Sequence, residues 1–491
     1  MKKLLLAVNL FVLLLMGCKK DVPVLSPDNA LLTFQFTVAG NIEEIPNDLI
    51  CNIYDTLVVG VTGNNNSRST LVADFTSTGI LVSINGVTQV SGETINDFTN
   101  PVIYSVKAEN GAERKYTVKL KTFTGLPIIY ITTESPVVSK DDYVKGNIVI
   151  DGNFDFTEGL YDGKIEIRGR GNSTWYADKK PYKIKLSDKA GLFGNPSDKE
   201  WAILANWYDK SLIRNDVSLE LSERLQREWT PKRNFTEVFM NGSTNGNYLL
   251  TETIKSGKGR VNIDAKNGGY LIEANYKEED GDPRFYTRIG IPFDVKEGTL
   301  AIDSIKLQVD NVYDQLQNHN FDPFTGYQKD FDLDAFVSWY LVNELILNND
   351  ARFFSSVFLQ KDNRTSKLKM GPVWDFDLSS GNVNYGQINP EGWYLMYGEF
   401  IQQIWLDPAF QAAVKAKWLK YRSQIISLPE YITRQGKYLD LSAKNNFQRW
   451  DILNQYLPNT VKVFGTYQGE VDYLKSWLTT RIAWMDKEIN K

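Results

Sequence analysis

The chain has 491 residues, a net charge of −5 and 13% aromatic residues, with acidic and basic side chains mixed along it. The length predicts about two or three domains, and the mixed charge argues against a nucleic-acid-binding surface. One histidine, His319, and two cysteines argue against Ser-His-Asp and Cys-His hydrolases and against metal sites built from several His or Cys. Any catalysis would therefore depend on carboxylates, lysines, hydroxyls and a bound metal ion.

The start of the chain is predicted to be an export signal rather than part of the fold. Two lysines precede an apolar run, residues 4–16, that is too short for a stable membrane anchor. Leu15-Met16-Gly17-Cys18 then matches a bacterial lipobox. We predict a signal peptide at 1–17 and a lipid on Cys18, which would anchor the mature chain in the bacterial cell envelope, at the outer membrane or its surface. Only Cys51 then remains, so no intrachain disulfide can form.

A short polar tether, residues 18–30, leads into a stretch with the alternating pattern of β-strands, residues 31–124. Asn110-Gly111 lies between two such runs, 102–108 and 114–121, and predicts a hairpin. Turn residues recur about every 8–12 positions, which is typical of a β-sandwich. We expect an immunoglobulin-like module, and we interpret it as a spacer or docking domain because it carries no polar cluster.

Residues 127–488 are predicted to form a larger α+β domain with two lobes, β-rich first and helix-rich second. Apolar spacing predicts a helix over 212–225, and from Leu333 onward the chain is expected to be mostly helical. Strands are expected at 128–133, 146–150, 164–168, 179–186, 235–240, 247–253, 269–275, 356–359 and 367–373, and further helices at 336–347, 411–426 and 471–488.

A glycine-containing turn joins two of these strands. Gly169 and Gly171 allow the backbone to approach an anion closely, and the polar residues that follow, Asn172 to Thr174, add donors. On the second strand Lys183 and Lys185 share one face. A lysine that projects from a strand beside a glycine turn is how protein kinases hold nucleotide phosphates, although each feature alone is common.

Two acidic clusters stand in the second half of the domain. Asp350 closes an apolar helical stretch, and Asp375 and Asp377 follow the strand predicted at 367–373. One carboxylate to orient a nucleophile and another to hold a divalent cation is the minimal set for metal-assisted phosphoryl transfer. An aspartate after a strand more often only stabilises a turn. The neighbouring motifs must therefore decide whether these aspartates have a functional role.

Four motifs occur in a fixed order along this domain: Arg168-Gly-Arg-Gly-Asn-Ser-Thr-Trp175, Lys180-Pro-Tyr-Lys-Ile-Lys-Leu186, Trp201-Ala-Ile-Leu-Ala-Asn206 with Asp209-Lys-Ser-Leu-Ile-Arg-Asn215, and Gly371-Pro-Val-Trp-Asp-Phe-Asp377. In these motifs the chain resembles the CotH kinase family, over roughly residues 127–485. The resemblance implies an atypical protein-kinase-like fold and ATP-dependent phosphorylation of protein Ser or Thr, with Mg²⁺ or Mn²⁺ as the metal.

The resemblance also implies roles for individual residues. Asp350 would orient the acceptor hydroxyl, and Asp375 and Asp377 would hold the metal ion. The nucleotide phosphates would be contacted by the glycine turn and a strand lysine, with Lys185 favoured over Lys183: Gly169, Arg170, Gly171, Asn172, Ser173, Lys183 and Lys185. Further carboxylates and one arginine are implied for support, namely Glu220 or Glu223 paired with that lysine, Glu252 or Glu273 in the nucleotide pocket, and Arg214 on phosphate or bracing its helix.

One position departs from the kinase pattern. Kinase catalytic loops place an Asn about five residues after the Asp, as a second metal ligand. Here that position is Ser355, and a hydroxyl is a weaker ligand for a hard cation than a carboxylate or amide oxygen. Ser355 is therefore the third expected metal ligand, and catalytic competence stays open.

Three functions remain open from the sequence. The first is kinase-like transfer to a protein substrate. The second is a catalytically weak, pseudokinase-like envelope protein that binds or scaffolds a partner, with a glycan or another envelope protein as candidates, because ATP is scarce outside the cytoplasm. The third is a metal-dependent phosphoesterase or glycan-active enzyme built on the same carboxylates. Membrane contact is expected only through the lipid on Cys18, and no nucleic acid is expected as a partner.

Overall fold

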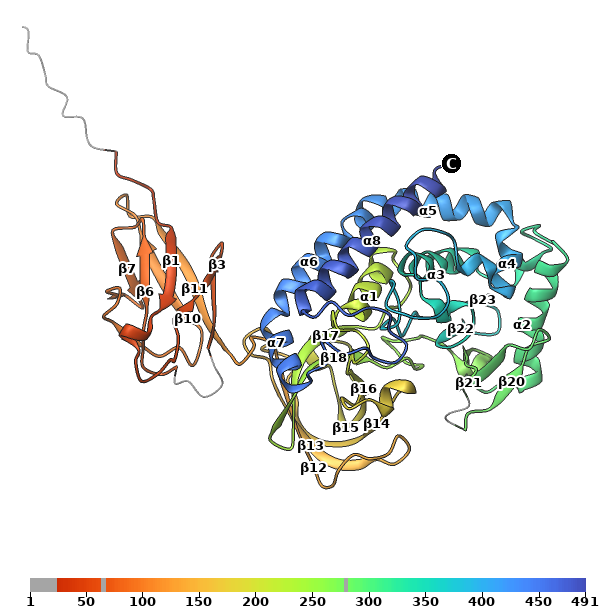
Figure 1. The fold of residues 1–491 in the computed structure, drawn as a ribbon, viewed down its shortest axis with the longest axis horizontal. Coiled ribbons are helices and arrows are strands. Elements are labelled where there is room, and N and C mark those ends of the chain that lie inside the picture. Colours follow the sequence, from red (N-terminus) through yellow and green to blue (C-terminus); the bar gives the residue numbers. More distant parts are fainter. Residues whose placement is uncertain (1–23, 63–67, 278–280) are drawn as a thin grey trace, which may run out of the picture. The chain divides into compact units, whose positions relative to one another are not determined.

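The computed structural model describes residues 24–62, 68–277 and 281–491. The predicted signal peptide and Cys18 lie outside the described residues. The chain divides into two compact units, Met1–Phe123 and Thr124–Lys491 (Figure 1). Among the described residues, no helix combines the length and the apolar character that crossing a membrane requires.

The first unit is all-β, as the alternating sequence pattern predicts. Its strands are β1 (Leu31–Phe36), β2 (Leu49–Ile50), β3 (Asn52–Tyr54), β4 (Leu57–Thr62), β5 (Leu71–Val72), β6 (Asp74–Ser77), β7 (Leu81–Ile84), β8 (Val87–Thr88), β9 (Ile95–Asn96), β10 (Val102–Lys107) and β11 (Glu113–Thr122).

Two sheets of this unit share one core. One sheet has the order β2-β1-β6 and the other β3-β4-β11-β10-β7-β8. Phe34 of β1, Tyr104 of β10 and Val118 of β11 are buried together between them. The predicted hairpin is confirmed, because β10 and β11 pair antiparallel and Gly111 turns the chain with a φ of +88°. The β4–β11 pair is parallel, which the sequence pattern does not indicate.

The second unit begins with a closed β-barrel of order β12-β13-β14-β15-β16-β18-β17. Alternate residues of each strand fill its interior, among them Ile165, Ile167 and Ile184. Because the side-chain period is two, Lys183 and Lys185 lie on the outer face. The strands are β12 (Ile128–Thr133), β13 (Val144–Asp151), β14 (Asp162–Gly169), β15 (Tyr182–Ala190), β16 (Asp198–Leu204), β17 (Arg233–Met240) and β18 (Ser243–Glu252).

A five-stranded sheet and most of the helices form the rest of this unit, around a second and larger core. The sheet order is β20-β21-β19-β22-β23, with β19 (Tyr270–Ala274), β20 (Arg284–Tyr286), β21 (Pro292–Gly298), β22 (Val357–Lys361) and β23 (Leu368–Met370). The helices are α1 (Arg214–Arg224), α2 (Ile302–Gln317), α3 (Leu333–Ile346), α4 (Glu399–Trp405), α5 (Pro408–Ile426), α6 (Leu428–Tyr438), α7 (Asp440–Arg449) and α8 (Tyr467–Ile489).

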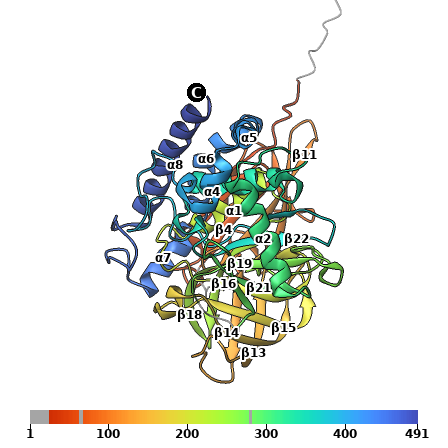
Figure 2. The ribbon, with the colours of Figure 1, turned by 90° about the vertical axis from the view of Figure 1, so that its right-hand side faces the viewer.

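Helix α3 is the central helix of the larger core. Every residue from Phe336 to Ile346 is buried, because α3 packs on α1, α5, α8 and β23 at once. In both views α5, α6 and α8 gather on the side of the unit away from barrel strands β13 and β14 (Figures 1 and 2). The loop that carries Asp350 therefore starts from a helix held on all sides.

The predicted order of an all-β region followed by a mixed α and β region is confirmed. The helix expected from residue 212 begins at Arg214, since Leu212 has a left-handed φ of +63°. The sequence patterns missed β16, β20, β21 and α2. Strand β16 opens with the polar run Asp198-Lys199-Glu200, and its apolar residues face the barrel interior only once the barrel has closed.

Candidate active site

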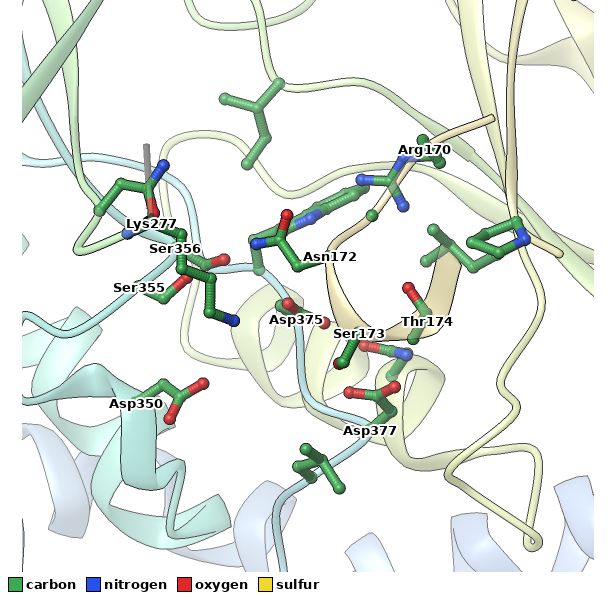
Figure 3. A pocket seen from close by; sticks show the side chains of 18 of the residues that line it. Arg170, Asn172, Ser173, Thr174, Lys277, Asp350, Ser355, Ser356, Asp375 and Asp377 are labelled. Atoms are coloured by element: carbon green, nitrogen blue, oxygen red, sulfur yellow. Dashed lines mark hydrogen bonds between the residues drawn. The ribbon is translucent and has the colours of Figure 1, made fainter. Parts of the chain in front are cut away.

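A cavity of about 670 Å³ lies between the barrel and the five-stranded sheet of the second unit. Its walls come from the turn after β14, the start of β15, the end of β16, strand β19 and the loops that follow α3 and β23 (Figure 3). This volume lies in the range of small-molecule sites. Polar side chains that stand far apart in the sequence therefore meet in one place.

Asp350 enters the cavity from a short 3₁₀ turn, Asn349–Ala351, that follows α3. The Asn348 side chain accepts a hydrogen bond from the Asp350 N–H at 3.2 Å, and the Tyr385 hydroxyl donates to Asp350 Oδ1 at 2.9 Å. Burial raises the pKa of Asp350 and nearby Asp375 adds to this, whereas Tyr385 and Lys277 oppose it. This carboxylate thus faces both an acidic and a basic neighbour.

Asp375 and Asp377 enter from the loop after β23. Asp375 is exposed to the cavity and has a φ of +66°, a left-handed conformation that Asp tolerates better than most residues. Asp377 is 8% exposed. Between them the Phe376 ring is buried, and its N–H donates to Asn215 Oδ1 at 2.8 Å. The buried ring and this hydrogen bond anchor the backbone between the two aspartates.

The surroundings of the Asp377 carboxyl disfavour its charged form. Burial raises its pKa well above the ordinary value, and the charges of Asp375, Asp209 and Asp350 add to this shift. A cluster of like charges with one buried member fits a divalent cation. Within the described residues no group of three His, Cys, Asp or Glu side chains is arranged to hold a metal ion. Two carboxylates nevertheless fit Mg²⁺, which usually takes one or two carboxylates together with waters and phosphate oxygens.

The raised pKa of Asp377 predicts that the stability of the fold depends on pH. A carboxyl whose pKa is raised in the fold binds more protons folded than unfolded, so the free energy of unfolding falls as pH rises above the unfolded value of about 3.9. Without metal, we expect the wild type to lose stability relative to Asp377→Asn as the pH rises from about 3.9 to neutral, by on the order of 1 kcal/mol per pH unit at most. Urea denaturation of both proteins with a chelator, from acidic to neutral pH, measures the difference. Parallel curves would contradict the prediction.

Six Lys and Arg side chains line the same cavity, namely Lys140, Arg168, Arg170, Lys183, Lys277 and Lys296. The Arg170 guanidinium lies 5.4 Å from the centre of the Trp374 ring; burial lowers its pKa, and Asp375 and Glu273 oppose this. Lys183 Nζ lies 2.9 Å from Glu200 Oε2. Lys277 follows β19 and points into the space beside Asp350 and Asp375 (Figure 3).

The glycine turn contributes to the cavity in part. Gly171 has a φ of +82°, and it lines the cavity together with Asn172, Ser173 and Arg170. Gly169 does not line it. A Cβ at Gly169 would stand 2.2 Å from the Trp175 ring, so this glycine allows tight packing of the turn instead.

Three other expected nucleotide contacts lie outside the cavity. Lys185 pairs with Glu166 at 3.3 Å, and Glu220 pairs with Arg224 at 2.8 Å. Glu252 is fully buried, 3.6 Å from Arg260. Lys185 stands two residues beyond Lys183 on β15, about 6.6 Å further along the strand. The lysine that reaches the cavity is therefore Lys183 rather than the favoured Lys185.

Lys183 does not pair with a carboxylate of helix α1, contrary to the expectation for the phosphate-binding lysine. Glu220 and Glu223 both pair with Arg233 of β17, at 3.5 and 3.0 Å, and the carboxylate paired with Lys183 comes from strand β16 instead. Of the two candidates for the pocket wall, Glu273 lines the cavity and Glu252 does not. Glu273 pairs with Lys296 at 3.3 Å, and its charge also raises the pKa of Arg170.

Ser355 lines the cavity, 6% exposed, in the turn between Asp350 and β22. It lies in the same chamber as Asp375 and Asp377 (Figure 3). Four further residues line the cavity that were not predicted from the sequence: Lys277, Tyr385, Asn206 and Asn215. Both asparagines stand at the ends of quoted motifs, and Lys277 follows a predicted strand, so a signal existed for these three.

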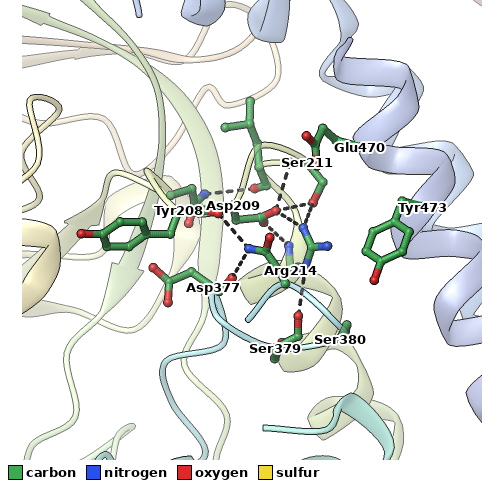
Figure 4. A network of polar contacts seen from close by, with 12 residues as sticks. Tyr208, Asp209, Ser211, Arg214, Asp377, Ser379, Ser380, Glu470 and Tyr473 are labelled. Atoms are coloured by element: carbon green, nitrogen blue, oxygen red, sulfur yellow. Dashed lines mark hydrogen bonds and ion pairs between the residues drawn. The ribbon is translucent and has the colours of Figure 1, made fainter. Parts of the chain in front are cut away.

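Arg214 braces the site from behind. It is 1% exposed and pairs with Asp209 at 2.5 Å, and its Nε–H donates to the Ser379 carbonyl at 3.2 Å (Figure 4). Asp209 also accepts from the Arg214 N–H at 2.7 Å, at the start of α1. Since Ser379 lies two residues after Asp377, this network ties α1 to the acidic loop. Of the two roles expected for Arg214, the geometry is that of a brace.

A comparison with known families matches residues 167–485 to the family model described as CotH kinase protein. No curated protein matches the chain. Among solved structures, one provisionally described as a glycoside hydrolase, from Bacteroides thetaiotaomicron, is 17% identical and covers 55% of this chain and 67% of its own, with a TM-score of 0.17. A likeness at that TM-score carries no argument about function.

Proposed function

Because the chain belongs to the CotH kinase family, we propose that it binds ATP with a divalent metal ion in this cavity and transfers the γ-phosphoryl group to a Ser or Thr hydroxyl of a protein. The observation that carries the proposal is the convergence of Asp350, Asp375 and Asp377 with Arg170, Lys183 and Lys277 on one cavity. In this proposal the barrel and the helix-rich body act as the two lobes of a kinase-like fold, with the nucleotide between them.

Asp350 is the proposed proton acceptor. The acceptor hydroxyl gives its proton to the Asp350 carboxylate, its oxygen forms a bond to the γ-phosphorus, and the bond from that phosphorus to the bridging oxygen of ADP breaks. Tyr385 and Lys277 both favour the charged form of Asp350 that this step needs.

The cations of the cavity are the proposed phosphate ligands. Lys277 stands beside Asp350, where negative charge on the transferring group would be neutralised, and Arg170 and Lys183 approach from the barrel side. Asp375 and Asp377 would hold the metal ion, with Ser355 as a weaker ligand. When bound, Mg²⁺ or Mn²⁺ supplies charge neutralisation of the phosphates.

The proposal is tested by calorimetric titration of the full chain with ATP, with and without Mn²⁺. We expect binding that requires the metal, followed by transfer of labelled phosphate to a protein acceptor. Absence of nucleotide binding at millimolar metal would refute the proposal. Release of inorganic phosphate without an acceptor would favour a phosphoesterase.

A second candidate, a partner-binding protein with weak or no catalysis, is favoured by Ser355 in place of the expected Asn. Of the aromatic side chains that could stack on a glycan, Trp393 packs against Trp405 and Trp484, at 5.5 and 5.0 Å between ring centres, whereas Tyr397 is 59% exposed. Nucleotide binding without transfer would favour this candidate.

Lys277→Met is expected to lower phosphoryl transfer about 100-fold, because removal of one charged group that stabilises the transferring phosphoryl costs about 10²–10³ in rate. ATP affinity should change much less, since Arg170 and Lys183 remain. Initial rates at saturating ATP measure the effect. Lys266→Met, at an exposed lysine outside the cavity, is the matched control. Equal rates for the two variants would show that Lys277 has no part in transfer.

We also propose that the mature chain is tethered to the bacterial envelope by the lipid on Cys18. The motif Leu15-Met16-Gly17-Cys18 supports this. Mass spectrometry of the N-terminal peptide from expressing cells tests it, since an unmodified Cys18 or an uncleaved leader would refute it.

A further inference from the structure

A second cavity, of about 620 Å³, opens on the outside of the barrel. It is formed by the end of β15, the loop into β16 and the loop after β18, residues 255–259. We call it the lysine groove, because five lysines line it: Lys185, Lys189, Lys199, Lys255 and Lys258. It differs from the active-site cavity, whose lining includes none of these five.

The acidic side chains of the lysine groove are already neutralised. Glu200 lies 2.9 Å from Lys183 and 3.7 Å from Lys255. Asp198 lies 3.4 Å from Lys255 and 3.8 Å from Arg260. Both carboxylates therefore already face cations, and neither of them pairs with Lys189 or Lys258.

Two lysines of the groove are open to a partner. Lys189 and Lys258 are exposed, and neither makes an ion pair with any residue that the structure describes. Lys199 donates to the Ser187 carbonyl, and Lys185 pairs with Glu166 at 3.3 Å, with about half of each side chain exposed. An exposed pair of this kind is worth little and exchanges easily for another carboxylate. The groove thus offers a spread of positive charge from three chain segments.

Part of the groove floor is formed by a glycine-containing loop. Gly257 and Gly259 flank Lys258, and a Cβ added at Gly257 would meet nothing within 4 Å. On the Gly257 side of Lys258 no side chain of the described residues blocks a backbone that lies across the groove, whereas Pro196 closes the Gly259 side, where an added Cβ would stand 3.1 Å from it. Backbone hydrogen bonds fix this loop, from the Gly257 N–H to the Val261 carbonyl at 3.0 Å and from the Arg260 N–H to the Gly257 carbonyl at 3.0 Å.

We propose that the lysine groove binds an acidic peptide segment of a partner protein. Dedicated phosphate sites favour arginine, whose fork binds two oxygens at once. The arginine nearest this groove, Arg260, is 4% exposed and donates to the Thr253 and Glu200 carbonyls at 2.9 Å. Each lysine of the groove carries a single compact charge, so the groove can pair with carboxylates that are spaced along an acidic peptide.

The groove also adjoins the candidate active site. Glu200 lines the groove, and its partner Lys183 lines the active-site cavity, so this ion pair is the wall between them. A segment bound in the groove would hold neighbouring residues of the same protein beside the cavity. If the proposed kinase function holds, the acidic segment belongs to the acceptor, but docking itself requires no catalysis.

The test is binding of a fluorescein-labelled peptide of alternating Glu and Ser to the full chain, followed by anisotropy without nucleotide or metal. We expect Lys189→Glu with Lys258→Glu to weaken binding at least about tenfold, which is about 1.4 kcal/mol. The control pair Lys415→Glu with Lys444→Glu carries the same charge change on exposed helix positions and should bind like the wild type. Thermal unfolding checks that both pairs keep the wild-type fold.

Several outcomes would overturn the proposal. These are equal weakening by both double variants, equal binding of a peptide with Gln in place of Glu, or tighter binding of polygalacturonate than of the peptide, which would indicate an anionic glycan instead. A phosphoserine peptide that alone binds would also overturn it. Because the assay contains no ATP, failed docking and failed phosphoryl transfer are separate results.

Discussion

Asp375→Asn is expected to abolish metal-dependent ATP binding at millimolar Mn²⁺ and to lower phosphoryl transfer by at least about 100- to 1,000-fold. Asp375 is the exposed carboxylate of the acidic loop, directed into the cavity beside Arg170. Loss of its charge removes one of two carboxylates available to a divalent ion, which the buried Asp377 cannot replace alone. Titration calorimetry and initial rates measure the two losses.

Asn is chosen at position 375 because it removes the charge without changing the backbone conformation. Asp375 has a φ of +66°, and Asn is one of the few residues that tolerates this conformation as well as Asp does. Ala at this position would add backbone strain. Asp451→Asn, at an exposed aspartate outside the cavity, is the matched control and should keep full activity. ATP binding by Asp375→Asn at the wild-type metal concentration would contradict the assignment of Asp375 to the metal.

Arg481→Met is expected to destabilise the second unit by about 3–5 kcal/mol, because it leaves a buried charge unpaired. Arg481 of α8 and Glu344 of α3 are both fully buried and lie 2.6 Å apart. Arg481 also donates to the Pro390 and Gly392 carbonyls, at 3.0 and 2.6 Å, and Glu344 accepts from the Tyr394 N–H at 3.0 Å. Urea denaturation, followed by the fluorescence of the buried tryptophans, measures the loss.

Two further variants identify the cause of that loss. Arg422→Met removes an ion pair between α5 and α8, with Asp486 at 2.7 Å, in which the arginine side chain is 47% exposed. It should cost no more than about 1 kcal/mol. Adding Glu344→Gln to Arg481→Met should recover part of the loss, because the unpaired carboxylate is removed as well. Equal losses for Arg481→Met and Arg422→Met would show that burial of the pair is not what matters.

The Glu344–Arg481 pair matters for function through its position. Glu344 lies on α3 shortly before Asp350, and Arg481 connects this helix end to the C-terminal helix. We expect Arg481→Met to lower activity in proportion to the unfolded fraction. A loss of activity in fully folded Arg481→Met protein would point to displacement of the Asp350 loop.

Much of the candidate site was predictable from local sequence. Asp350, Asp375 and Asp377 each follow an apolar element, so their position at the end of an element could be inferred from the pattern alone. Gly171 and Asn172 stand in a turn whose glycine spacing indicates a close approach. For these residues the local chain determines the conformation, and the structure brings them into one cavity.

The expected site residues that lie outside the cavity are ones whose surroundings depend on distant segments. Lys183 and Lys185 are equivalent in the sequence pattern, and only the position of the cavity along β15 separates them. Glu220 and Glu223 face Arg233, which β17 brings to α1 from another part of the chain. Gly169 is explained by the Trp175 ring that packs over it, rather than by an anion.

The sequence by itself determined the order of an all-β region and a mixed α and β region, the family, and the acidic residues of the site. These follow from side-chain periodicity and from motifs that are local in the chain. Only the tertiary structure showed that Lys277 lies in the cavity with those acids, and that Lys183 rather than the favoured Lys185 does so. The physical reason is that electrostatic partnership depends on distance in space, and a local pattern holds no information about which distant segments the packed core brings within a few ångströms.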